Sequence, residues 1–265
     1  GPGKFEHHMS LMRQPAWGHS HIEVVDFNKD NHPDLLITNG DNAEIENYPP
    51  KPYHGVRLHL NDGKNNFSEA LFFPQYGAYR ALAADFDGDG DLDVIGGSRM
   101  EQRIFWFENV TSDAIAFIEH RIDLTDEVVV TGFNMDFADL SGDGRVDIAI
   151  RDRRNGLTWL KQPAEPTGVW HAHVIGNIAP DNLVGFVLAD LNDDGRLDAF
   201  SGAYSSGSRD ADADADPLRA VGRLAWFEQP ADPTERWIRH DVSRRARGMF
   251  DKFITLDLDA DDDLD

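Results

Sequence analysis

The nine residues DFDGDGDLD at positions 85–93 decide how this chain folds. Aspartate stands at every odd position of the string, and glycine stands at the fourth and sixth. Similar strings recur with their first aspartates 51 to 67 residues apart; they are DFNKDNHPD (26–34), DLSGDGRVD (139–147), DLNDDGRLD (190–198) and DLDADDDLD (257–265). We number the five strings loops one to five in chain order. A recurrence of this kind predicts a repeat architecture in which each copy is one supersecondary unit.

Short apolar segments flank every string. In the second copy, ALAA (81–84) precedes it, and DVIGGS (93–98), RIFWFEN (103–109) and AFIEHRI (116–122) follow it. These segments have the length and composition of β-strands, and no long amphipathic helix pattern is present. Radial repetition of four-stranded blades protects strand edges. The sequence therefore predicts an all-β chain: a β-propeller of four-stranded blades, each with an Asp-rich loop between strands one and two.

We expect a single repeat domain over residues 1–265, with units starting near residues 20, 79, 133, 184 and 251. The last unit is incomplete, and we favour a truncated chain over an open ring or completion by partner chains. Residues 4–9 (KFEHHM) are similar to the fourth strand of a unit. They are therefore a candidate closing strand.

Oxygen donors recur at fixed positions in each string, which favours calcium. Ca²⁺ takes about six to eight oxygen ligands in a flexible shell. Side chains at positions 1, 3, 5 and 9 offer oxygens, position 7 offers its backbone carbonyl, and position 6 needs a left-handed turn residue, as Gly90 provides. One isolated string would be a solvated turn, but five in register predict several structural ions. The candidate ligands are Asp26, Asn28, Asp30, His32 and Asp34; Asp85, Asp87, Asp89, Asp91 and Asp93; Asp139, Ser141, Asp143, Arg145 and Asp147; Asp190, Asn192, Asp194, Arg196 and Asp198; and Asp257, Asp259, Asp261, Asp263 and Asp265.

The strings DFDGDGDLDV (85–94) and DLNDDGRLDA (190–199), with the flank RIFWFENV (103–110), resemble the FG-GAP or VCBS repeats of integrin alpha-subunit propellers and many secreted bacterial proteins. The resemblance implies a propeller with structural Ca²⁺ in the turn between strands one and two. We also expect an extracellular, periplasmic or cell-surface location, and a role in carbohydrate binding or cell adhesion, although a fold of this kind hosts many functions. Loop one departs from the pattern at Asn31 and Pro33, and loop five departs at Asp262.

Polar residues also occur at the start of the first strands, opposite the Asp-rich loops. The first strand of a propeller blade lines the central channel, and the longest connecting loops open on the same face. Function concentrates on such loops over a rigid scaffold. We expect a ligand pocket there, although a water-filled channel mouth would also be polar. The candidate residues are His21, Glu23, Tyr53, His54, Tyr79, Arg80, Asn134, Asp136 and Lys252.

Composition narrows the function further. The net charge of −23 argues against binding nucleic acid or anionic membranes, and no apolar run has the length of a membrane span. We expect a module that binds a glycan or a protein, rather than an enzyme. The alternatives are a propeller-type sugar lyase or dehydratase and a structural spacer. Five tryptophans at repeat positions are predicted to pack within blades: Trp106, Trp159, Trp170, Trp226 and Trp237.

Overall fold

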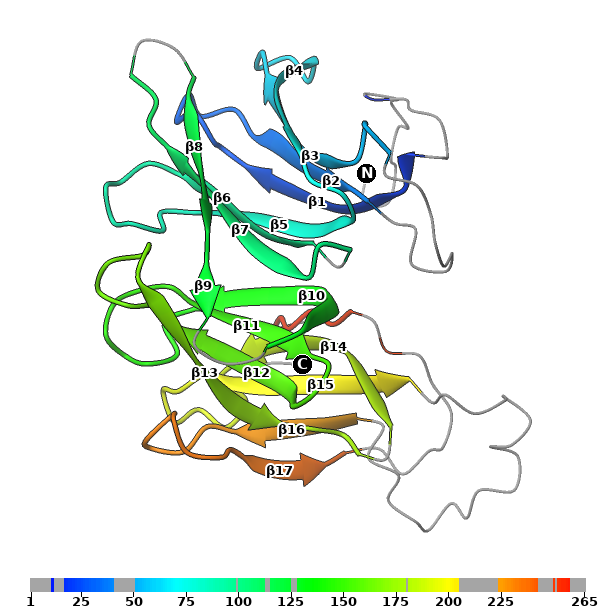
Figure 1. Cartoon of the computed structure of the whole chain (residues 1–265), viewed down its shortest axis with the longest axis vertical. Helices are drawn as coiled ribbons and strands as arrows, with labels where there is room; N and C mark the ends of the chain where they lie inside the picture. Colours follow the sequence, from blue (N-terminus) through cyan, green and yellow to red (C-terminus); the bar gives the residue numbers. More distant parts are fainter. Residues whose placement is uncertain are drawn as a thin grey trace, which may run out of the picture. The chain divides into compact units, whose positions relative to one another are not determined.

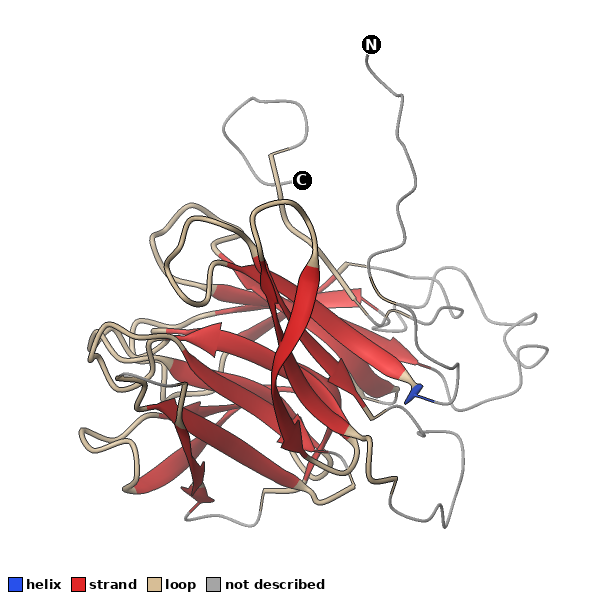
Figure 2. Cartoon of the chain, turned by 90° about the horizontal axis from the view of Figure 1, so that it is seen from above, coloured by secondary structure: helices blue, strands red, loops and turns tan. Residues whose placement is uncertain are grey.

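Apart from one short 3₁₀ segment, strands and the loops that join them make up the described part of the chain (Figure 2). The computed structural model describes residues 11, 17–40, 51–98, 100–112, 115–124, 128–179, 181–204, 224–242, 250 and 252–257. Within these ranges there is no α-helix, and only Trp17 is 3₁₀-helical. No helix in the described residues is long and apolar enough to cross a membrane. The prediction of an all-β chain is confirmed.

The strands form four antiparallel blades, and in each blade neighbours in sequence are neighbours in the sheet (Figure 1). Blades one and two contain β1 (His19–Val25), β2 (Asp34–Asn39), β3 (Gly55–Asn61) and β4 (Phe67–Pro74), then β5 (Ala78–Ala84), β6 (Asp93–Ser98), β7 (Arg103–Asn109) and β8 (Phe117–Arg121). Blades three and four contain β10 (Val130–Ala138), β11 (Asp147–Asp152), β12 (Gly156–Lys161) and β13 (Val169–Gly176), then β14 (Asn182–Ala189), β15 (Asp198–Tyr204), β16 (Leu224–Glu228) and β17 (Ile238–Asp241). The predicted four-stranded propeller blades are confirmed.

The chain divides into two compact units, each with its own core. Unit one comprises 1–85, 89–101 and 105–119, and unit two comprises 86–88, 102–104 and 120–265. Aliphatic and aromatic side chains from facing blades fill each core, and such burial is the main favourable term in folding. The core of unit one includes Phe27, Leu36, Leu58, Val94 and Phe105; that of unit two includes Leu157, Trp159, Ile175, Phe186 and Phe227.

Loops one to four each connect the first strand of a blade to the second, as the sequence predicts. The apolar face of the first strand is predicted to pack between blades. This holds for Ala81, Met135 and Phe186, which are at most 3% exposed. It is wrong for Ile22 and Val24 in β1, which are 55% and 64% exposed, because the described residues leave this face of β1 uncovered.

Two further segments differ from expectation. A short strand β9 (Asp123–Leu124) pairs in parallel with β13, which the repeat pattern did not predict. Residues 253–256, expected to be the first strand of a fifth unit, carry no strand. The candidate closing strand 4–9 and residues 258–265 of loop five lie outside the described residues.

Candidate functional site

Two positions in each described loop have left-handed backbone. Position 6 was predicted to need this conformation, and the prediction is confirmed. Position 4 needs it too, and glycine at this position in loops two and three was the signal in the sequence. The φ angles at position 6 are 66° (Asn31), 94° (Gly90), 84° (Gly144) and 85° (Gly195); at position 4 they are 61° (Lys29), 82° (Gly88), 72° (Gly142) and 58° (Asp193).

The aspartate at position 1 closes each loop on itself. In loop three, Asp139 accepts the N–H of Asp143 on Oδ1 at 3.0 Å and the N–H of Gly144 on Oδ2 at 2.7 Å. Loops one and four repeat this pair of bonds, through Asp26 and Asp190. The first aspartate of loop two also accepts the N–H of the sixth residue, at 3.1 Å. The loops therefore share one fold, and their oxygens are held in similar places.

The aspartate at position 9 is buried and holds the blade together. In loop three, Asp147 accepts the N–H of Gln162 on Oδ1 at 2.8 Å, and those of Leu140 and Ser141 on Oδ2 at 3.0 and 2.8 Å. Burial raises the pKa of Asp147 to about 6, although these N–H bonds act to lower it. Equivalent bonds to the residue that ends or follows strand three join Asp34 to Asn61, Asp93 to Asn109 and Asp198 to Gln229. Position 9 thus has a structural task that requires no ion.

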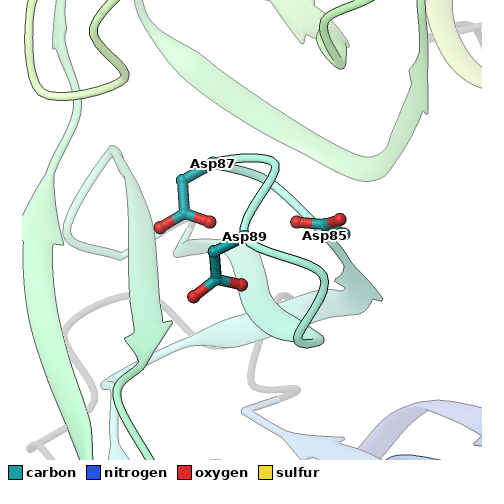
Figure 3. Close-up of side chains that lie close together, drawn as sticks. All are labelled: Asp85, Asp87 and Asp89. Atoms are coloured by element: carbon teal, nitrogen blue, oxygen red, sulfur yellow. The ribbon is translucent and has the colours of Figure 1, made fainter.

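The side chains of Asp85, Asp87 and Asp89 lie together on loop two (Figure 3). One oxygen of each carboxylate lies within 4.8 Å of the others, and all three residues are exposed. Asp93, the fourth predicted carboxylate, is the buried acceptor of a backbone N–H. Because the cluster offers only oxygen atoms, its chemistry fits a hard cation such as Ca²⁺.

In loops one and four an amide also binds the carboxylate at position 5. Asn28 Nδ2 donates to Asp30 Oδ2 at 3.1 Å, and Asn192 Nδ2 donates to Asp194 Oδ2 at 3.2 Å. His32 Nδ1 lies 3.2 Å from Asp30 Oδ1. Of loop five, only Asp257 lies within the described residues; Asp259, Asp261, Asp263 and Asp265 do not.

On the opposite face, two predicted ligand residues accept backbone N–H bonds. Glu23 Oε2 accepts the N–H of Ala83 at 2.8 Å in unit one, and Asp136 Oδ2 accepts the N–H of Leu188 at 3.1 Å in unit two. Ala83 and Leu188 occupy the same repeat position, two residues before a loop. Each acid therefore fastens the first strand of one blade to the first strand of the next.

Three other residues predicted for this face are buried in their units. Asn134, Tyr79 and His54 are 3%, 5% and 1% exposed, and Asn134 Nδ2 donates to the carbonyl of Val184 at 3.4 Å. Among the remaining predicted residues, His21, Tyr53 and Arg80 are half-buried and Lys252 is exposed. That these nine residues form one pocket stays a prediction.

Glu23 gives a test of the strand-fastening role. Burial raises the pKa of Glu23, although the N–H of Ala83 and the charge of Arg80 act to lower it. Folding therefore disfavours the ionised form of the carboxyl group. The stability contributed by Glu23 is therefore complete below about pH 4.5 and is lost as pH rises through its folded pKa. Glu23→Gln keeps an acceptor for the N–H and should be at least as stable as wild type at pH 7, with a smaller advantage at pH 4.

Urea unfolding of both proteins at the two pH values measures this difference. Glu23→Ala removes the acceptor and should be less stable than Glu23→Gln by about 1–3 kcal/mol. Equal stability of the alanine and glutamine variants would show that the bond to Ala83 contributes nothing.

Comparison with known families accounts for the recurring loops. The FG-GAP-like repeat model matches residues 26–96, 85–150 and 139–201, so it covers more than half of the chain. The chain belongs to the FG-GAP-like repeat family. Each match runs from one Asp-rich loop to the strand that follows the next, so an FG-GAP-like repeat here is a blade counted from its loop. No curated protein matches the chain.

Proposed function

We propose that this FG-GAP-like repeat protein is a calcium-stabilised binding module that acts outside the cell or at its surface. The observation that carries the proposal is the cluster of Asp85, Asp87 and Asp89 on loop two. Carboxylates this close repel one another, and a divalent cation between them removes that repulsion. The ion would be held by these three oxygens and by the carbonyl of Asp91. Its role would be structural, because it would hold the three carboxylates of the loop together.

The opposite end of blade one supports a ligand-binding role. Strand β1 runs into loop one, so Trp17, which precedes β1, lies at the far end from that loop. Trp17 stacks on Tyr53 with ring centroids 5.3 Å apart, and His54 lies near both Tyr53 and Tyr76. Arg57 lies over the Trp17 ring at 4.5 Å. Arg57 is buried beneath the Trp17 ring, whereas Trp17 and Tyr53 are partly exposed, and exposed aromatic side chains of this kind suit a glycan or a protein surface.

Binding is favoured over catalysis because Glu23 and Asp136, the two carboxylates among the predicted ligand residues, already accept backbone N–H bonds. A screen of the calcium-loaded protein against a glycan library, with detection of reaction products, tests this choice. Binding without turnover is the expected result. Formation of a product would contradict this proposal and indicate that the protein is an enzyme.

Removal of calcium tests the metal half of the proposal. An ion that binds only the folded state at about 100 times its Kd stabilises that state by about 2.7 kcal/mol. For a chain of this size, EGTA should therefore lower the Tm by roughly 5 to 10 °C. Asp87→Asn should abolish most of this shift, because it removes one of the three clustered charges.

The matched control is Asp123→Asn, which removes a charge from a side chain that is 74% exposed and outside the loops. It should leave the EGTA shift intact. A wild-type melting curve that does not respond to EGTA, in protein free of other metals, would contradict calcium stabilisation.

A further inference from the structure

Glutamine side chains connect neighbouring repeats within unit two. Gln162 and Gln229 follow the third strands of blades three and four, where their backbone N–H groups bind the aspartate at position 9. Gln162 Nε2 donates to the carbonyl of Phe86 at 2.7 Å. Gln229 Nε2 donates to the carbonyl of Leu140 at 3.0 Å. Phe86 and Leu140 both stand at position 2 of the preceding Asp-rich loop, so a buried carboxamide is built into the repeat at this place.

Blade two has asparagine at the equivalent position. The backbone N–H of Asn109 binds the position-9 aspartate of its own loop at 2.7 Å, which establishes the equivalence. Its shorter side chain turns back on its own blade: Nδ2 donates to the carbonyl of Leu92 at 3.0 Å, and Oδ1 accepts the N–H of Thr111 at 3.1 Å. The position-2 carbonyl of loop one is that of Phe27. Within the described residues, the side chain of Asn109 makes no bond to it.

A cavity of about 220 Å³ in unit one lies between these two residues, since Phe27 and Asn109 both line it. Leu58, Leu60 and Ile115 contribute apolar walls, and Ile115 is 42% exposed. The cavity is therefore bounded by the same two repeat positions that a glutamine side chain joins in unit two. The shorter side chain of Asn109 and the direction of its amide account for the space.

The surroundings of the position-2 residue are otherwise alike in the two units. The ring of Phe27 packs on Phe117, in the fourth strand of the next blade, with centroids 6.0 Å apart. In unit two, the ring of Phe86 stacks on Trp170, also in a fourth strand, at 5.5 Å. A carboxamide supplied from outside would thus meet the same kind of carbonyl, beside the same kind of aromatic pair, that Gln162 meets.

We propose that this cavity binds a neutral carboxamide from a ligand, namely the side chain of a glutamine in a protein or peptide. Its amide nitrogen would donate to the carbonyl of Phe27, and its methylene groups would contact the apolar walls. Lys29 and Asp91 also line the cavity and are paired at 2.8 Å, so together they present a donor and an acceptor without a net charge. A carboxylate would instead meet the aspartates of loop two, and like charges repel.

The inference goes beyond the proposed function, because the cavity lies beside the Asp-rich loops, whereas Trp17 lies at the other end of β1. The two sites can therefore be tested independently. A glutamine is favoured over the acetamido group of a sugar, because hydroxyl groups beside that acetamido group would face Leu58, Leu60 and Ile115 without partners.

NMR titration of the protein with N-acetylglutaminamide tests the class of ligand. A ligand of this size should bind with a Kd on the order of 1 mM. N-acetylmethioninamide has an uncharged side chain of similar length without the amide, and should bind at least about tenfold more weakly. Equal binding of the two compounds, no binding of either, or tighter binding of N-acetylglucosamine than of N-acetylglutaminamide would overturn the inference.

Variants at the strand-three position test the location. Asn109→Gln supplies the amide from within the chain, as in blades three and four, and should weaken the binding of N-acetylglutaminamide at least about tenfold. The matched control is Asn61→Gln, which makes the same change in blade one, where the backbone N–H also binds the position-9 aspartate. This control should leave the Kd unchanged. Equal Kd values for the two variants would contradict the assignment of the cavity.

A second pair of variants leaves the bonds of Asn109 in place. Ile115→Trp puts a larger side chain at the edge of the cavity and should weaken binding to a similar extent. Ile118→Trp changes a residue of β8 that is 48% exposed and does not line the cavity, so it should bind as wild type does. If Ile115→Trp is folded and binds N-acetylglutaminamide with the wild-type Kd, the cavity is not the site and the inference is overturned.

Discussion

Replacing Asp147 by alanine is expected to destabilise the protein by at least about 2 kcal/mol, since the N–H groups of Ser141 and Gln162 lose their acceptor and each costs about 1–3 kcal/mol. Both N–H groups lie 2.8 Å from the carboxylate oxygens, whereas the N–H of Leu140, at 3.0 Å from Asp147, also donates to the carbonyl of Ala138. Asp147→Asn should cost less, because its amide oxygen still serves one side. Urea unfolding with circular dichroism measures both changes.

The response to EGTA separates this acid from the clustered carboxylates. The penalty for Asp147→Ala comes from hydrogen bonds and should persist when EGTA is present. The penalty for Asp87→Ala should vanish under the same conditions, because the wild-type protein has then also lost its ion. If EGTA erased the Asp147→Ala penalty, the role of Asp147 would be to bind metal and not to hold the strand.

Trp159→Ala should cost about 3–5 kcal/mol, as is usual for a fully buried tryptophan. Its side chain is 0% exposed, stacks on His173 at 4.7 Å, and donates Nε1–H to the carbonyl of Pro233 at 3.2 Å. Loss of the ring leaves a cavity in the core of unit two, while the carbonyl of Pro233 still accepts the Nε1–H of Trp237 at 3.1 Å.

Trp226 is the matched control, since it holds the same repeat position in blade four and stacks on His240 at 4.2 Å. It is only half-buried, so Trp226→Ala should cost clearly less than Trp159→Ala. Thermal unfolding of the two variants provides the comparison. Equal losses would mean that stacking on histidine, and not burial within the unit, accounts for the stability that these tryptophans provide.

Sequence alone predicted most of the strands. The segments 93–98 and 103–109 coincide with β6 and β7, and the segments 81–84 and 116–122 overlap β5 and β8. Alternating apolar residues between Asp-rich and Gly-rich turns are a local signal, so they determine where strands begin and end. The short parallel strand β9 gave no such signal, because two residues are too few for a period.

The roles of individual carboxylates were harder to predict. An aspartate at position 9 and an aspartate at position 5 have the same chemistry in the sequence. They differ in which backbone N–H groups of distant strands lie beside them, and that depends on packing. The same reason explains Glu23 and Asp136: their shared position was recognised, but the N–H groups of the neighbouring first strand could not be placed.

The buried aspartate at position 9 makes the shape of a blade independent of the other side chains of its loop. This residue anchors the end of strand three by accepting hydrogen bonds from its backbone N–H groups. Changes at positions 3, 5 and 7 therefore alter what the loop binds while the end of strand three stays anchored. A duplicated blade could thus drift through forms with and without metal and remain foldable at every step. For protein engineering, this means that a metal site could be introduced into a blade or removed from it by substituting three surface residues.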